Sequence, residues 1–205
     1  MPAESLQTSG FVLLKRPPAD VFQSFTVFSP EHGTLVVLQR LPRKSASTTT
    51  ALDLFDEATL LMESSIQGRT WFVKEAQLIS RHHDIGRSYE ALRMACALTT
   101  LVARNPVDAE SRATVAELLR SALLAFGSGP RADVVYFKSL YRFARDEGYP
   151  LKQQWFPTLP PADRTAVATL LNLPIAEQTT APAAVLRLQR RLEEYLRGHT
   201  EILLG

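Results

Sequence analysis

The sequence predicts an α+β protein in which a five-stranded barrel is followed by an all-α helical domain. The first 80 residues consist of short apolar segments separated by turns that contain Pro, Gly or Ser, which is typical of β-strands. After residue 81 the apolar residues recur at helical spacing, which indicates amphipathic helices. This change of pattern predicts two domains, residues 1–82 and residues 83–205.

The composition is that of an ordinary globular protein, with 45% hydrophobic and 21% charged residues. No apolar run approaches the roughly 20 residues that span a bilayer, and the N-terminus lacks the basic and apolar regions of a signal peptide. We therefore expect a cytoplasmic protein with no membrane contact.

The first three strands are expected between Gly10 and Ser45, where β-branched and aromatic residues are frequent. Two turn sequences separate them, one at residues 17–20 and one at residues 29–33. Proline presets φ in both turns, and Gly33 can adopt the positive φ that closes a hairpin. The segment therefore predicts a compact β meander.

Two further strands are expected at Ala58–Ser65 and Thr70–Ile79, after a small polar loop and a short helical turn at Leu52–Phe55. Three strands, a linker with a helical turn and two more strands form the element order of the OB-fold, a five-stranded barrel. An open five-stranded sheet is the alternative architecture.

The second half predicts a helical bundle. Asp108 is expected to cap the N-terminus of its second helix, and Gly148-Tyr149-Pro150 is expected to end the third. The expected helices span Gly86–Arg104, Asp108–Phe126, Val134–Ala144, Asp163–Leu171 and Ala183–Leu204.

The predicted meander contains a specific series of residues: Val12-Leu13, Lys15-Arg16, Asp20, Phe28-Ser29-Pro30-Glu31-His32-Gly33 and Arg43-Lys44-Ser45. This series resembles the opening domain of the RecO family, the bacterial recombination mediators. A second similarity covers residues 137–141 and the Gly148-Tyr149-Pro150 break, so the resemblance extends into both domains. It implies an OB-fold joined to a helical domain.

The resemblance implies a non-catalytic protein that acts in DNA repair and homologous recombination. RecO-like proteins bind single- and double-stranded DNA at the nucleoid, anneal strands, and load recombinase together with RecR. They also bind the acidic C-terminal tail of single-stranded-DNA-binding protein. The alternative is a protein-interaction scaffold with RecO architecture and weak or no DNA binding, which the net charge of only +2 favours.

Basic residues at the strand ends are the predicted DNA-binding site. If they converge at one rim of the barrel, they form a groove for phosphates. Charge alone favours a different role, because Lys and Arg also protect sheet edges from pairing with other chains. The resemblance favours DNA, although Leu41-Pro42 departs from the family pattern. The predicted residues are Lys15, Arg16, Arg40, Arg43 and Lys44.

Aromatic residues of the barrel are a second feature of DNA-binding proteins, because bases stack on exposed rings. In a barrel of this size most rings must fill the interior. The sequence does not reveal which ring is exposed, so none is assigned to the site. The candidates are Phe22, Phe25, Phe28, Trp71 and Phe72.

Lys138, Arg142 and Arg145 stand at positions i, i+4 and i+7 of the third helix and form a basic stripe. Such a stripe is normally a solvated face. The resemblance implies a partner-binding surface instead, where the acidic tail of single-stranded-DNA-binding protein would pair with these groups.

Neither a metal nor a cofactor is expected, and no residues indicate an enzyme. Cys96 is the only cysteine, which excludes the four-cysteine zinc motif that many RecO-like proteins carry. An ordered loop at residues 148–161 is expected in its place. The sequence His82-His83-Asp84 is expected to be a linker, and no nucleotide-binding or hydrolase motif is present.

Overall fold

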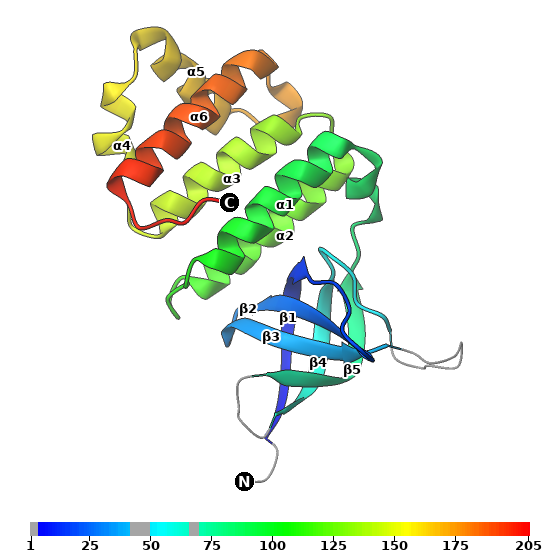
Figure 1. The fold of residues 1–205 in the computed structure, drawn as a ribbon. Helices are drawn as coiled ribbons and strands as arrows, with labels where there is room; N and C mark the ends of the chain where they lie inside the picture. Colours follow the sequence, from blue (N-terminus) through cyan, green and yellow to red (C-terminus); the bar gives the residue numbers. More distant parts are fainter. Residues whose placement is uncertain (1–3, 42–49, 66–69) are drawn as a thin grey trace. The chain divides into compact units, whose positions relative to one another are not determined.

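In the computed structural model, which describes residues 4–41, 50–65 and 70–205, five strands precede six α-helices (Figure 1). The predicted α+β class is therefore confirmed. The strands are β1 (Ser5–Lys15), β2 (Phe22–Ser29), β3 (Gly33–Arg40), β4 (Glu57–Ser64) and β5 (Trp71–Ser80). The helices are α1 (Tyr89–Arg104), α2 (Arg112–Ser128), α3 (Ala132–Asp146), α4 (Leu151–Gln154), α5 (Pro161–Asn172) and α6 (Pro182–His199).

The chain divides into two compact units, which we call the strand unit and the helical unit. The strand unit comprises Met1–His82 and Pro106–Leu119, and the helical unit comprises His83–Asn105 and Arg120–Gly205. Helical spacing places residues 106–119 in the second domain, but their contacts lie in the strand unit. Arg112, for example, donates a hydrogen bond from Nη1 to the carbonyl oxygen of Glu31 at 2.9 Å.

Strand β1 pairs on both sides and so closes the sheet. Its residues 5–11 pair antiparallel with β4, and its residues 11–15 pair antiparallel with β2. The strand order is β1-β2-β3-β5-β4, and the pairing of β4 with β1 completes a closed barrel. Strands β3 and β5 are parallel where Val37 meets Trp71, while the other neighbours are antiparallel.

Gly10 lies where β1 passes closest to β2. A Cβ atom at this position would meet the carbonyl oxygen of Phe28 and Cγ1 of Val27, each at 2.7 Å. Real Cβ atoms do not approach a backbone oxygen so closely, so the packing here requires glycine.

Alternate residues of the strands point inward and fill the barrel, as expected for strand periodicity. Leu35, Trp71, Val73 and other partly buried side chains pack against this core. The buried core consists of Val12, Phe25, Val27, Val37, Leu52, Ala58, Leu60, Met62 and Ala76.

Two turns show where local expectations succeed and fail. Gly33 adopts φ +72° at the β2–β3 turn, as its position in the predicted hairpin requires. The helical turn expected at residues 52–55 is wrong, because this segment forms a turn in which Phe55 has φ +69°. Contacts with distant residues, described below, hold that turn in place.

Helix α3 lies at the centre of the helical unit and contacts α1, α4, α5 and α6. Its side chains are buried on nearly all sides, which is typical of a central helix. Helix α1 begins at the N-cap Ser88, whose side chain accepts a hydrogen bond from the backbone N–H of Ala91. The predicted cap at Asp108 is wrong, since α2 begins at Arg112.

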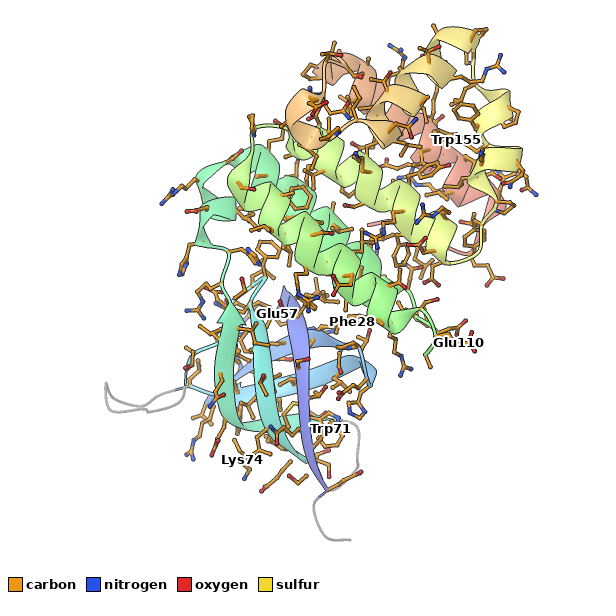
Figure 2. The ribbon with its side chains drawn as sticks, turned by 180° about the vertical axis from the view of Figure 1, so that it is seen from behind. Phe28, Glu57, Trp71, Lys74, Glu110 and Trp155 are labelled. Atoms are coloured by element: carbon orange, nitrogen blue, oxygen red, sulfur yellow. The ribbon has the colours of Figure 1, made fainter. Side chains whose placement is uncertain are left out.

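Residues 148–161 are ordered but helical, so the loop predicted here is only partly correct. They form α4 and the short 3₁₀-helix η2 (Phe156–Thr158). Trp155, labelled in Figure 2, is only 2% exposed, and its ring centroid lies 6.2 Å from that of Tyr141. No helix in the described part of the chain is long and apolar enough to cross a membrane.

Replacing Gly10 with alanine should destabilise the protein by about 1 to 3 kcal/mol, because the new methyl group collides with the backbone of β2. Urea unfolding of the full chain measures this change. Gly198→Ala in α6 is the control, since no atom lies within 4 Å of the added group. It should instead stabilise its helix by about 0.5 to 1 kcal/mol. Equal effects of the two substitutions would contradict the close approach at Gly10.

Candidate nucleic-acid interface

The basic ends of β1 and β3 lie on either side of the start of β2. Arg40 is in register with Phe22, and Lys15 is in register with Phe25. The backbone N–H of Arg16 donates to the carbonyl oxygen of Ser24 at 3.0 Å, which continues the same ladder. The structure thus places three of the predicted residues, Lys15, Arg16 and Arg40, around the start of β2. Arg43 and Lys44 lie outside the described residues.

The charge of Lys15 is compensated within the strand unit. Its Nζ lies 2.9 Å from Oδ1 of Asp53, and both side chains are solvent-accessible. Burial of Asp53 opposes its ionisation, but hydrogen bonds from Lys15 and from the Leu54 backbone hold the pKa of Asp53 below its ordinary value. Arg16 and Arg40, in contrast, are exposed and form no ion pair with any described residue. Among the described basic residues predicted for this rim, they are the two without an ion pair.

Two partly exposed phenylalanines lie beside Arg40. The ring centroids of Phe22 and Phe72 are 5.6 Å apart at an interplanar angle of 62°, an edge-to-face arrangement. Phe25 and Val37 belong to the barrel core, so strand alternation directs Phe22 and Leu38 to the outside. Phe72 is in register with Leu38 and lies between Trp71 and Val73, which pack against the barrel core, so Phe72 also points outward.

We call this surface the outer face and define it as Phe22, Val36, Leu38, Arg40 and Phe72. Val36 is 41% exposed and adds aliphatic surface to this face. The face therefore combines exposed apolar area, a pair of aromatic rings and an arginine without an ion-pair partner among the described residues.

The other aromatic candidates are placed differently. Phe25 and Phe28 are fully buried, and Trp71 packs partly against the barrel core. Figure 2 labels Phe28 and Trp71. Strand alternation alone puts Phe22 and Phe28 on the same side of β2, so sequence periodicity did not separate them. The distinction depends on what covers each ring.

One acidic residue beside the outer face is paired. Glu63 is in register with Phe72, and its Oε2 lies 2.6 Å from Nζ of Lys74 on β5, which Figure 2 labels. Because this pair is locally neutral, Glu63 does not offset the charge of Arg16 and Arg40.

A buried ion pair that the sequence analysis missed holds the linker beside β1. The carboxylate of Asp56 is fully buried and accepts hydrogen bonds from Nε and Nη2 of Arg81 at 2.8 and 2.5 Å. Arg81 also donates to the carbonyl oxygen of Ala51, and the N–H of Asp53 donates to Asp56. Asp53 is thereby positioned to meet Lys15. The sequence did contain a signal for this pair. Asp56 directly precedes β4, and Arg81 directly follows β5, the antiparallel partner of β4.

The three side chains of the predicted basic stripe on α3 form contacts within the helical unit. Lys138 is half-buried, which lowers its pKa, and its Nζ donates to the carbonyl oxygen of Leu173 at 2.8 Å. Arg142 and Arg145 both pair with Asp146, at 3.4 and 2.6 Å. The three residues do share one side of α3, but each already has a partner: Lys138 at the end of α5, and both arginines within α3 itself.

The remaining reactive side chains offer little chemistry. Cys96 is half-buried, and burial raises the pKa of its thiol. His83 and Asp84, expected in a linker, belong to the 3₁₀-helix η1 (His83–Arg87). Within the described residues no cluster of three or more His, Cys, Asp or Glu side chains could hold a metal ion.

Comparison with protein-family models finds no match to this chain. Comparison with curated proteins finds no relative either. The RecO resemblance therefore remains an expectation of the sequence, and function is inferred from the side chains of the outer face and its rim.

Replacing Arg81 with alanine should destabilise the strand unit by about 3 kcal/mol, because it leaves the Asp56 carboxylate buried without its cation. Urea unfolding followed by Trp71 fluorescence, in a Trp155→Phe background, reports on this unit. Lys74→Ala removes an exposed ion pair instead and should cost less than about 1 kcal/mol. If both variants lost equally little stability, the Asp56–Arg81 pair would not be a structural anchor.

Proposed function

We propose that the strand unit is an OB-fold that binds single-stranded DNA on its outer face without reading the base sequence. The observation that carries this proposal is the partly exposed Phe22–Phe72 pair beside Arg40, an arginine with no ion pair among the described residues. Bases stack on such rings, and the arginine contacts the phosphates between them.

The arrangement of the strands supports the OB-fold assignment. Five strands in the order β1-β2-β3-β5-β4 make a small closed barrel in which β2 and β3 are hydrogen-bonded neighbours. OB-folds bind oligonucleotides on the face of their second and third strands. In this chain those two strands supply Phe22, Val36, Leu38 and Arg40 of the outer face.

The chemistry of the outer face suits binding that ignores sequence. Each stacked base contributes about 1 to 3 kcal/mol, and every base has a face that can stack. Arg16 and Arg40 neutralise phosphates and release condensed counterions, which makes the affinity depend on salt. The same interactions, without hydrogen bonds to base edges, suit a protein that anneals complementary strands.

We further propose a RecO-like role in DNA repair and recombination, with annealing of single- and double-stranded substrates and recombinase loading with RecR. Binding of the tail of single-stranded-DNA-binding protein belongs to the same proposal. The support for these partners is the resemblance in the meander and at the end of α3. The cytoplasm, at the nucleoid, is the corresponding location.

A second candidate function is a protein-interaction scaffold with weak or no DNA binding. The observation that favours it is charge compensation: Lys15, Arg142 and Arg145 pair with carboxylates, and Lys138 caps α5. The exposed Val36 would then belong to a protein interface. Titration with DNA at low salt separates the two functions.

The double variant Arg16→Ala/Arg40→Ala should weaken binding of labelled oligo(dT) by at least tenfold at moderate salt. It should also reduce the slope of log K against log[salt] by roughly 1.4, since two phosphate contacts at about 0.7 each are lost. Fluorescence anisotropy across a salt series measures both quantities.

The matched control is Arg142→Ala/Arg145→Ala, which removes the same charge from two arginines already paired with Asp146. It should leave the slope unchanged. If both double variants lower the slope equally, binding follows net charge and not the outer face. Absence of binding by the unmodified chain at low salt would favour the scaffold.

Replacing Phe22 with leucine should weaken oligo(dT) binding at least fivefold without changing the salt slope, because it removes a stacking surface but no charge. The control is Val36→Ala on the same face, which carries no ring and should alter the affinity less than twofold. Unchanged affinity of Phe22→Leu would show that bases do not stack at this ring.

A further inference from the structure

The helical unit contains a cavity of about 310 Å³ that is lined by α1, α3 and α6. Its volume is at the lower end of the range for small-molecule sites, roughly 300 to 1,000 Å³. It is independent of the outer face, since its residues all belong to the helical unit. The polar side chains that line it are Arg93, Tyr136, Gln189, Arg190 and Glu193.

Gln189 supplies a buried acceptor that has no partner. Its side chain is 7% exposed, and its Nε2 donates to Oε1 of Glu193 at 2.8 Å. This bond fixes the orientation of the amide, because the reverse orientation would place two acceptors together. Its Oε1 is inaccessible and accepts no hydrogen bond. Buried polar atoms normally have a hydrogen-bond partner, so this oxygen is a candidate acceptor for a donor from outside the chain.

Tyr136 adds a second unpartnered polar group to the same cavity. The residue is 5% exposed, and its hydroxyl forms no hydrogen bond with any residue that the structure describes. Burial raises the pKa of Tyr136, with the nearby Glu193 acting in the same direction. The hydroxyl therefore stays protonated and can donate to an anion.

Arg93 and Arg190 supply the positive charge. Both are exposed residues that line the cavity, and neither forms an ion pair within the described part of the chain. Among the side chains that line the cavity, only Glu193 carries a carboxylate; it accepts from Gln189 and lies 3.7 Å from Arg197. The two guanidinium groups thus match a dianion, which a phosphate monoester is at neutral pH.

A larger cavity of about 580 Å³ in the same unit lacks these features. Three of its polar groups already have partners: the Tyr195 hydroxyl donates to Gln154, Arg191 pairs with Asp163, and His199 Nδ1 lies 3.0 Å from the Tyr195 carbonyl oxygen. The smaller cavity is therefore the better binding site.

We propose that this smaller cavity binds a small organic phosphate monoester. Arg93 and Arg190 hold the phosphate, and Tyr136 donates to one of its oxygens. A small shift of the Gln189 amide exposes its Oε1, which then accepts from a hydroxyl of the ligand. The compact volume selects a ligand with few atoms beyond the phosphate and one hydroxyl-bearing group. This function is separate from DNA binding by the strand unit.

Isothermal titration of the full chain with sn-glycerol 3-phosphate tests the proposal. We expect saturable binding that is at least fivefold tighter than that of inorganic phosphate, while glycerol alone does not bind. No saturable binding of glycerol 3-phosphate would overturn the proposal. Equal affinity for inorganic phosphate would also overturn it, because the hydroxyl contact to Gln189 would then have no effect.

Two variants locate the binding in this cavity. Arg190→Ala should weaken it at least tenfold, whereas Arg164→Ala, which removes an exposed arginine of α5, should leave it unchanged. Gln189→Met should weaken binding at least fivefold without lowering the melting temperature of the free protein, because removal of the unsatisfied oxygen offsets the loss of the Nε2 bond to Glu193. A purely structural Gln189 would lower the melting temperature instead. Binding that survives both Arg190→Ala and Gln189→Met would overturn the proposal.

Discussion

The strand unit depends on one strand that pairs on both of its sides. Strand β1 meets β4 along one half and β2 along the other, with Phe11 in both ladders. This is possible because Gly10 lets the backbones approach to a distance that no side chain permits. The closed ring then fixes the rest: the core fills from alternate residues, and the basic ends of β1 and β3 come to lie on either side of β2.

The local charge of each surface depends more on which side chains form ion pairs than on the net charge of +2. Asp53 and Asp56 neutralise Lys15 and Arg81, and Asp146 pairs with two arginines of α3. What remains beside the exposed rings is Arg40, with Arg16 at the neighbouring strand end. A weakly basic protein can therefore present a concentrated positive site, because solvent-exposed pairs cancel locally while unpaired groups act at short range.

The helical unit shows the complementary case of polar groups without partners. The basic side chains of α3 already have partners within the unit. In contrast, Tyr136 on α3 and Gln189 on α6 line a cavity and have polar atoms without a hydrogen-bond partner among the described residues. A folded protein satisfies nearly all of its buried polar atoms. Gln189 Oε1 is one of the exceptions, and the ligand proposed for the cavity would supply its missing donor.

The sequence by itself determined the α+β class, the order of the elements and the glycine of the β2–β3 turn, because periodicity and backbone preferences act over a few neighbouring residues. Only the tertiary structure decided that Phe22 is accessible while Phe28 is buried, that Lys15 is paired while Arg40 is not, and that residues 106–119 join the strand unit. These outcomes depend on contacts between residues far apart in the chain, such as Lys15 and Asp53. These distant contacts determine which side chains are buried and which charges are paired. A local sequence pattern contains no information about them.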